Sequence, residues 1–471
     1  MTQTHEPRPL PTDRSSPFDP PEELIRLGSR RPVSRIVYAD GSIGWLVTGH
    51  AEAQAVLGDG RFSARKELVR LPVPWLGHME RVPAGPGEFI FMDPPEHARF
   101  RKLLAGYFTM RRMRQFIPRV EEIAQQRLDA MEEAGQPCDL MKVFAYPIPS
   151  LAICELVGMP YAEAGVMHDE ITRMFSFDSP PEETRAAAAA IHRMLYELLL
   201  RKRAKPADDI MSELVISGQL SVEEILRVAS LLLIGGFDNT ANMIGLGVYA
   251  LLQHPEQLAL LRAQPELVES AVEELMRYVP SLHIGPIRAA LEDVELGGES
   301  IRAGEVLTLS LSAANRDERR FEEPDRLDIM RTATRQLAFG YGVHQCIGQT
   351  LARIEMQVAH AALLRRFPTM RLAIPGDEVP MRENIVPYGP RLLPVVWGMR
   401  YDHQSSGARR RSGRHAGRPC ALGTLRHRHR GRARPVPAGA AVAPRCAPGP
   451  ARAPAHGRWR HDHRSPAPGH R

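Results

Sequence analysis

The longest regular stretch of apolar positions runs from Ser221 to Gln253. Ser221-Val-Glu-Glu224 forms a capping box, because the serine caps the first helical turn and the glutamate reaches back to it. His254-Pro255 ends the pattern, since the residue before a proline disfavours helix. At 1.5 Å per residue the helix spans about 50 Å. A helix of this length, apolar nearly all round with a polar interruption at Asp238, is expected to cross the middle of a large domain.

Shorter patterns predict further helices and small sheets. Residues 35–48 form two β-rich runs around Asp40-Gly41 and predict a hairpin. Extended structure is also expected at 291–311 and 385–397, with irregular coil over 313–340. We therefore expect the mainly α fold class with small β-sheets, built as one large helical domain. The remaining helices are expected at Glu96–Phe116, Val120–Glu133, Ile148–Leu156, Glu182–Lys202, Pro265–Tyr278 and Gln349–Phe367.

Charge is distributed unevenly along the chain. The 471 residues carry a net charge of +6. Residues 401–471 hold 16 arginines and two aspartates without lysine or glutamate, whereas residues 1–400 hold 45 basic and 53 acidic residues. The C-terminal stretch has no hydrophobic period and is rich in Pro, Gly, Ala and Arg, which predicts disorder. The expected organisation is a disordered lead over 1–20, a folded domain over 21–400 and a disordered basic tail over 401–471.

The tail invites two interpretations. Its composition is what GC-rich DNA gives when it is read out of frame, which favours a non-functional extension. The alternative is an arm that binds nucleic acid or another polyanion. We favour the first interpretation and expect no nucleic-acid partner for the domain.

Composition excludes several classes of protein. No stretch reaches the roughly 18 uncharged apolar residues of a spanning helix. The first 21 residues contain six prolines and no apolar core of a signal peptide. The five cysteines are widely spaced and form no C-x-x-C pair, which argues against a disulfide scaffold or a structural zinc site. A soluble protein of the reducing cytoplasm is expected, without membrane attachment.

The sharpest chemical feature is Phe339-Gly-Tyr-Gly-Val-His-Gln-Cys-Ile-Gly348, which leads into a helix. Its glycines permit positive φ and close approach of the backbone. Cys346 stands at the helix start, where free N–H groups and the helix dipole are expected to lower a thiol pKa. One cysteine there suits a single axial ligand to a flat cofactor. A buried apolar cysteine or a catalytic nucleophile are the alternatives, and no partner base accompanies the nucleophile.

This segment resembles the haem-binding loop of cytochromes P450, whose pattern is F-x-x-G-x-H-x-C-x-G. Glu274-Leu-Met-Arg277 resembles the E-x-x-R helix of that family, and Pro324-Asp-Arg326 resembles its P-x-R-F segment. The motifs occur in the family's order across residues 20–400. The resemblance implies that Glu274, Arg277 and Arg326 form a structural ion network. The loop residues that match are Phe339, Gly342, His344, Cys346 and Gly348.

The resemblance implies haem b, iron protoporphyrin IX, as cofactor, with Cys346 as the metal ligand. Residues 93–101 and Pro286-Ile-Arg288 resemble the stretches of bacterial members that bind the haem propionates. Two buried carboxylates need such charge-assisted donors. The cofactor-binding residues expected from the resemblance are His97, Arg101, Arg288, Phe339, Gly340, His344, Cys346, Ile347 and Gly348.

Halfway along the long helix, two adjacent glycines each cost about 1 kcal/mol relative to alanine and make room beside the helix. The resemblance implies that O2 binds there above the iron and that an acid–alcohol pair relays protons, with Asp238 as the acid. Asn239 departs from the family's usual threonine, and Thr240 is turned about 100° around the helix. Asparagine can orient a water but is a poorer relay than a hydroxyl. The catalytic residues expected here are Gly235, Gly236, Asp238, Asn239 and Thr240.

The resemblance implies a soluble bacterial monooxygenase that hydroxylates or epoxidises a small organic substrate, in natural-product tailoring by analogy. The expected partners are O2, a ferredoxin and its NAD(P)H-dependent reductase, and the expected state is a monomer. Asn239 leaves open an oxidase that couples phenols, including on a carrier-bound peptide, and a haem sensor is the non-enzymatic alternative. The substrate pocket is expected to be lined by Leu71–Phe91, Met174–Ser179, Leu232–Asp238, Leu282–Ile287 and Val386–Gly389.

Overall fold

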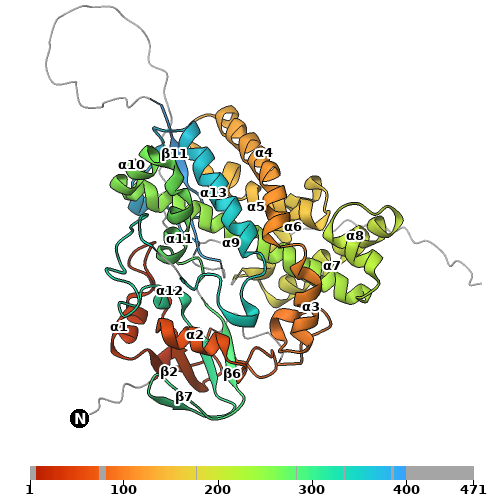
Figure 1. The fold of residues 1–471 in the computed structure, drawn as a ribbon, viewed down its shortest axis with the longest axis vertical. Helices are drawn as coiled ribbons and strands as arrows, with labels where there is room; N and C mark the ends of the chain where they lie inside the picture. The colour runs from red at the N-terminus through yellow and green to blue at the C-terminus, as the bar shows by residue number, and fades with distance from the viewer. Residues whose placement is uncertain are drawn as a thin grey trace, which may run out of the picture. The chain divides into compact units, whose positions relative to one another are not determined.

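The computed structural model describes residues 7–73, 81–176, 178–282, 284–332, 335–382 and 387–398. Helices make up most of this part of the chain, and β2, β6 and β7 lie at one end while β11 lies beside α10 at the other (Figure 1). The expected mainly α fold class with small sheets is confirmed. The helices are α1 Glu22–Arg30, α2 His50–Gly58, α3 Glu96–Ala105, α4 Met110–Ala134, α5 Pro147–Val157, α6 Tyr161–Phe175, α7 Pro181–Ala204, α8 Ile210–Ser217, α9 Val222–Gln253, α10 Pro255–Ala263, α11 Val268–Tyr278, α12 Leu311–Ala314 and α13 Gln349–Arg366.

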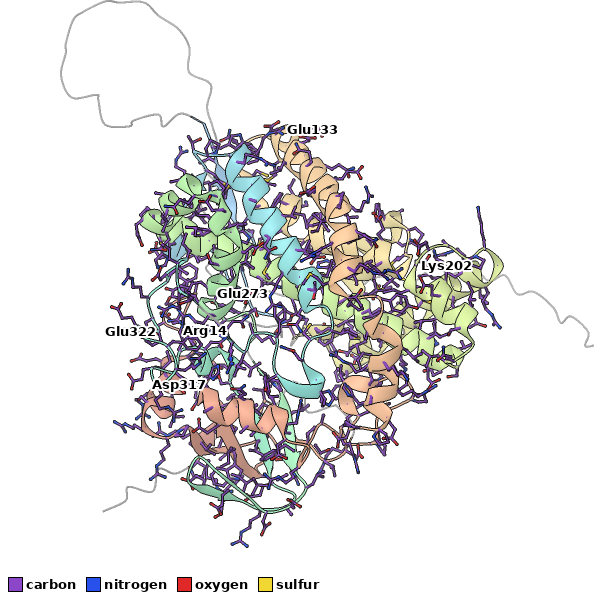
Figure 2. The ribbon with its side chains drawn as sticks, viewed as in Figure 1. Arg14, Glu133, Lys202, Glu273, Asp317 and Glu322 are labelled. Carbon is purple, nitrogen blue, oxygen red and sulfur yellow. The ribbon has the colours of Figure 1, made fainter. Side chains whose placement is uncertain are left out.

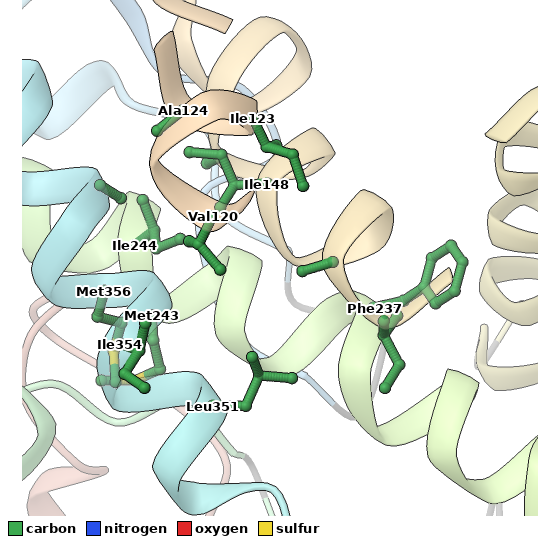
Figure 3. Close-up of a cluster of buried hydrophobic side chains, with 14 of the residues drawn as sticks. Val120, Ile123, Ala124, Ile148, Phe237, Met243, Ile244, Leu351, Ile354 and Met356 are labelled. Atoms are coloured by element: carbon green, nitrogen blue, oxygen red, sulfur yellow. The ribbon is translucent and has the colours of Figure 1, made fainter. Parts of the chain in front are cut away.

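Helix α9 is the expected central helix, and it has the expected capping box. The Ser221 hydroxyl accepts a hydrogen bond from Glu224 N, and the Glu224 carboxylate accepts one from Ser221 N at 2.8 Å. Most of its side chains are buried, because α9 lies against α5, α7 and α13. Figure 3 shows Phe237 and Ile244 of α9 in the same apolar cluster as Ile148 of α5 and Leu351 of α13. Within the described residues, α9 alone is long and apolar enough to span a membrane, and most of it is buried in the domain.

The larger sheet has the strand order β1-β2-β3-β9-β6-β4. The hairpin predicted around Asp40-Gly41 is confirmed, since β2 and β3 pair antiparallel and Val37 lies opposite Ile43. A three-stranded and a two-stranded sheet complete the β structure. The strands are β1 Arg8–Pro9, β2 Val33–Val37, β3 Ile43–Val47, β4 Phe62–Ser63, β5 Cys138–Asp139, β6 Ile287–Ala290, β7 Val294–Leu296, β8 Glu299–Ile301, β9 Val306–Leu309, β10 Arg371–Leu372 and β11 Pro394–Val396.

The break between the third and fourth helices differs from the expectation. We predicted one helix to Phe116 and another from Val120, but the structure ends α3 at Ala105 and starts α4 at Met110. The Thr109 side chain caps α4 by accepting a hydrogen bond from Arg112 N at 3.3 Å, and α4 then continues through Pro118.

The N-terminal segment differs from the predicted disordered lead over 1–20. Residues 7–20 lie against the domain, with β1 parallel to β2 and Phe18 buried. The Phe18 ring lies 4.6 Å from that of Tyr249, and Arg316 donates to the Phe18 carbonyl at 3.0 Å. Arg14, labelled in Figure 2, lies over the Tyr388 ring at 4.4 Å. These contacts order a segment whose composition alone suggests disorder. The predicted basic tail over 401–471 lies outside the described residues.

Candidate active site

An internal cavity of about 390 Å³ separates the middle of α9 from the cysteine loop and the first turns of α13. Its wall is mostly apolar, with a group of basic side chains at one end. The oxygen-side and loop residues expected from the sequence meet here, although they lie about a hundred positions apart in the chain. The predicted site residues that line the cavity are His97, Arg101, Gly235, Gly236, Asn239, Thr240, Arg288, Phe339, Gly340, His344, Cys346, Ile347 and Gly348.

The cysteine loop directs the Cys346 thiol into this cavity. Cys346 N donates to the Phe339 carbonyl at 2.9 Å, which closes the loop before α13 begins. Gly342 has φ +72°, and a Cβ there would lie 2.3 Å from the Leu57 carbonyl oxygen, so only glycine fits. The surface that Cys346 exposes borders the cavity although the residue lies deep in the domain.

The electrostatics of the thiol differ from the expectation. Burial raises the pKa of the Cys346 thiol, and the Gly348 N–H together with the charge of Arg101 offset this only in part. The predicted net lowering of its pKa at the helix start is therefore wrong. The groups that favour a thiolate are nevertheless present, and they are the ones the sequence suggested.

Four basic side chains gather at one end of the cavity: His97, Arg101, Arg288 and His344. The His97 and His344 rings lie 4.0 Å apart, and His344 Nε2 is buried without a hydrogen-bond partner. Burial, with repulsion from the neighbouring arginines, lowers the pKa of His97 to about 4 and that of His344 to about 3. Burial also lowers the pKa of Arg288 to about 10.

This basic cluster is short of anions. The nearby Asp93 carboxylate already accepts hydrogen bonds from the Ser63 hydroxyl at 2.5 Å and from Ala64 N at 2.9 Å. The buried guanidinium of Arg288 needs a negatively charged partner, and the neutral imidazoles of His97 and His344 can donate hydrogen bonds to the same partner. Two carboxylates of a flat group lying over Cys346 would supply that charge, so the donor set fits the propionates of haem.

The face of α9 toward the cavity provides space and few polar atoms. A Cβ on Gly235 would meet nothing within 4 Å, whereas one on Gly236 would lie 2.7 Å from the Ile153 side chain. Asn239 Nδ2 donates to the Gly235 carbonyl at 3.4 Å, and Asn239 Oδ1 is buried without a partner. Thr240 and Glu355 both line the cavity, and the Thr240 hydroxyl partly offsets the burial that raises the pKa of Glu355, a residue which the sequence analysis did not single out.

Asp238 is not among the residues that line the cavity. His168 Nε2 of α6 lies 3.0 Å from Asp238 Oδ1, and Arg382 Nη2 donates to Asp238 Oδ2 at 3.3 Å. Burial alone would raise the pKa of Asp238, but the His168 hydrogen bond and the Arg382 charge outweigh burial and hold it below its usual range. The expected relay acid is therefore tied to the side of α9 away from the cavity.

The expected ion network is present with one different member. Arg277 Nε donates to Glu274 Oε2 at 2.8 Å, and both side chains are fully buried. Arg326 takes part only through its carbonyl, which accepts from Arg277 Nη2 at 3.1 Å, while its side chain pairs with exposed Glu323. Arg331 supplies the second basic side chain, and its Nε lies 3.2 Å from Glu274 Oε1. The loop around 326 turns the Arg326 side chain to the surface and brings Arg331 inward.

The chain matches the family model for cytochrome P450 over residues 46–386. It is 46% identical to Cytochrome P450 105C1 of Streptomyces sp over 398 residues, which cover 84% of this chain and all of the relative. The chain is a member of the cytochrome P450 family. This P450 is also 40% identical to the mycinamicin IV hydroxylase/epoxidase of Micromonospora griseorubida over 401 residues, which cover 82% of this chain and 98% of that relative.

Solved structures agree with this assignment. The crystal structure of CYP105P1 in complex with filipin I superposes with a TM-score of 0.78 at 40% identity, covering 83% of this chain and 99% of that one. As a cytochrome P450, the protein is a haem-dependent monooxygenase of the soluble bacterial type. The haem-sensor interpretation is thereby set aside.

The predicted pocket segments contribute unequally. Phe89, Leu232, Leu282 and Pro286 line the cavity, whereas the described residues of Met174–Ser179 and Val386–Gly389 do not. Part of Leu71–Phe91 lies outside the described residues. Sequence reasoning missed His168, Arg382 and Glu355. Only the glutamate left a signal, as a charged residue in an otherwise apolar part of the last long helix.

Proposed function

We propose that this P450 hydroxylates or epoxidises a small, largely apolar organic substrate in natural-product tailoring. The observation that carries the proposal is the apolar cavity between Gly235 of α9 and the Cys346 thiol, with all of its arginine and histidine side chains gathered at one end. The relatives support the reaction class, since one is named a hydroxylase/epoxidase and another structure contains filipin I.

The residues around the cavity have different roles in this reaction. Bound haem supplies the iron at which O2 is reduced and from which one oxygen atom is inserted into the substrate. Cys346 would hold the iron as a thiolate, supported by the N–H groups of the α13 start. His97, Arg101, Arg288 and His344 would bind and orient the propionates. Gly235 leaves room for O2 and substrate, and Asn239 presents a free carbonyl oxygen to a water or a substrate hydroxyl.

The test is the spectrum of the reduced carbonyl complex. Cys346→Ala should abolish its red-shifted Soret band, because the thiolate ligand is lost. Cys154→Ala is the matched control, since Cys154 is buried in α5 and does not line the cavity, and it should keep the band. A band that persists in Cys346→Ala would refute the proposal. With the ligand established, a screen of metabolites for the low-to-high-spin shift would identify the substrate class.

We further propose that electrons come from a ferredoxin and its NAD(P)H-dependent reductase, and that the enzyme acts as a cytoplasmic monomer. The arginines and lysines that we assign to the docking face are Arg99, Lys102, Arg111, Arg112, Arg114, Arg353, Arg365 and Arg366. Four of these eight are engaged in ion pairs: Arg99, Arg112, Arg353 and Arg366. The Arg353 partner is Glu273 of α11, labelled in Figure 2.

The exposed cations Lys102, Arg111 and Arg114 of α3 and α4 make no ion pair within the described residues and are better candidates for an acidic ferredoxin. The double variant Arg111→Glu/Arg114→Glu should slow ferredoxin-driven reduction several-fold at low salt, with the difference shrinking as salt rises. Dithionite reduction should not change. Arg30→Glu on α1, which lies away from α3 and α4 in Figure 1, is compared with the single variant Arg111→Glu as a control that reverses the same number of charges. Equal slowing by Arg30→Glu would contradict a specific docking face.

A further inference from the structure

Three methionine side chains line the cavity, and the mechanism above has no use for them. Met243 lies on α9, Met276 on α11 and Met356 on α13, so three separate helices bring thioether groups to one cavity. Each residue is at most 7% exposed. Among the residues that the structure describes, no further methionine borders the cavity. These three residues are called the cavity methionines below.

Met243 lies on the same face of α9 as the groove at which O2 is expected. Gly235, Asn239 and Met243 follow one another at four-residue intervals, and all three line the cavity. Four residues correspond to about 6 Å along the helix. Figure 3 shows Met243 and Met356 in one buried cluster with Leu351, which also borders the cavity. An oxidant released at the groove therefore meets a thioether about one helical turn away.

The cavity wall offers such an oxidant few other reactive groups. Its substrate side is largely aliphatic, as at Ile153, Leu231 and Leu232. The other sulfur atom on the wall belongs to Cys346, which the haem iron would hold as its ligand. Hydrogen peroxide converts methionine into its sulfoxide, which is polar where the thioether was apolar.

The groove also provides a reason for peroxide to form. Reduction of O2 by two electrons and two protons gives hydrogen peroxide whenever no oxygen atom reaches a substrate. Asn239 stands where a hydroxyl is expected, and an amide is a poorer proton relay than a hydroxyl. Peroxide that forms inside the domain must pass the cavity wall before it reaches solvent.

We propose that the cavity methionines are a site of self-modification, which hydrogen peroxide released by the enzyme into its own cavity oxidises to sulfoxides. The proposal rests on the monooxygenase function above, with NAD(P)H as the source of the two electrons for peroxide. The methionine sulfur then takes one peroxide oxygen as the O–O bond breaks, and the other oxygen leaves as water. Sulfur loses the two electrons that peroxide gains. The new polar group lies in an apolar wall, so activity falls as uncoupled turnovers accumulate.

The test is peptide mass spectrometry of the haem-loaded enzyme after turnover without substrate, with NAD(P)H, a ferredoxin and its reductase. Catalase is present, because it destroys peroxide in bulk solvent and is too large to enter the cavity. The sulfoxide fraction of the cavity methionines should exceed that of the reference residues about fivefold. The references are the exposed Met110 and Met330 and the fully buried Met131 and Met211, which do not border the cavity.

Two further samples identify the source of the oxidant. Peroxide added to the resting enzyme without catalase should oxidise the exposed Met110 and Met330 first, which reverses the order. Carbon monoxide, which occupies the iron in place of O2, should abolish the sulfoxides at the cavity methionines. Sulfoxides that persist at these residues under carbon monoxide would mean that the oxidant arises elsewhere, and would overturn the proposal.

The consequence for activity is tested with Met243→Leu/Met276→Leu/Met356→Leu, because leucine removes the sulfur and nearly conserves the volume. This variant should complete several-fold more turnovers than wild type before half of its own starting rate is lost. Met243→Leu alone should show part of the gain, and it serves if the triple variant does not fold. Met131→Leu/Met211→Leu is the matched control and should lose activity as fast as wild type.

The outcomes separate this proposal from the general one. A parallel sample without catalase shows whether peroxide accumulates. Unmodified cavity methionines in an enzyme that makes peroxide would overturn the proposal and leave the monooxygenase reaction intact, as would equal oxidation of the reference methionines. A wild-type protein without the red-shifted carbonyl band would instead refute the thiolate-ligated monooxygenase, and with it the source of the peroxide.

Discussion

The buried carboxyl groups on the two sides of helix α9 have opposite pKa shifts: the pKa of Asp238 is lowered and that of Glu355 is raised. On one side Asp238 is bound by an imidazole and a guanidinium, which together hold it ionised. On the other side burial raises the pKa of Glu355 well above its usual range, and the Thr240 hydroxyl opposes this only in part. The exposed fraction of both residues is 3% or less. Their different states therefore come from their partners and not from their depth.

The two carboxyl groups therefore differ in what they can do. Asp238 is suited to stabilise the fold, and Glu355 is suited to exchange a proton. An ionised, doubly bound carboxylate joins three elements that are distant in sequence: α6, α9 and the segment at Arg382. Arg382 also donates to the Tyr146 hydroxyl at 3.0 Å, which extends the network. A neutral carboxyl group with one partner ties little together, but it can release and regain a proton.

The largest expected effect is that of Glu355→Gln on the pH dependence of the free energy of unfolding. Glu355 has a raised folded-state pKa, so wild type loses stability as pH rises from its unfolded pKa, about 4.5, toward the folded value. Glu355→Gln removes this loss. Its stability relative to wild type should therefore rise by up to about 1.4 kcal/mol per pH unit above pH 5. Denaturant titrations of the holoenzyme at several pH values measure it, and parallel curves would contradict a buried neutral Glu355.

A smaller loss of folding stability is expected when a partner of Asp238 is removed. Arg382→Met removes one of the two partners of Asp238 and should cost about 2 kcal/mol near neutral pH, below the roughly 3–5 kcal/mol of a fully broken buried pair, because the His168 hydrogen bond remains. The lowered Asp238 pKa makes this contribution present above the unfolded pKa and lost as pH falls through the folded one. Arg391→Met, on the exposed surface of the same segment, should change stability by less than about 0.5 kcal/mol. Equal losses of stability in Arg382→Met and Arg391→Met would contradict a stabilising role for the contact between Arg382 and Asp238.

The smallest effect concerns the attachment of α6 alone. His168→Phe deletes the hydrogen bond to Asp238 and should cost about 1 kcal/mol, less than the arginine because His168 is partly exposed. Amide hydrogen exchange in Tyr161–Phe175 should accelerate about fivefold, and exchange in α13 should not change. His168→Gln keeps a donor and should recover part of the protection. Uniform acceleration across both helices would indicate general unfolding instead of a local release.

The sequence was sufficient for one of the two sides of α9 and insufficient for the other. The capping box and apolar run of α9 predicted its start and end, and the family resemblance of the cysteine loop implied which residues of α9 and of the loop meet at the cavity. These features depend on local geometry. The partners of Asp238 lie 70 and 144 positions away and are brought in by tertiary packing, which no local pattern encodes.

The errors have the same physical origin. The predicted lowering of the Cys346 pKa considered the helix start and left out the cost of burying a charge, which the sequence does not state. Residues 7–20 have the composition of a disordered segment, yet a few apolar and cationic contacts to distant residues hold them. Arg331 replaced Arg326 in the ion network because the path of an irregular coil decided which side chain faced inward.

The docked N-terminal segment also constrains the order in which the chain folds. Phe18 contacts Tyr249 and Tyr278, and its carbonyl is bound by Arg316, whereas Arg14 lies over Tyr388. Arg14 therefore meets its partner Tyr388 only after more than 350 further residues have been made. Contacts of such high sequence separation form late and slowly. Strand β1 can pair with β2 soon after both are made, whereas the contacts of Phe18 and Arg14 close only when the much later segments around Tyr249 and Tyr388 are present.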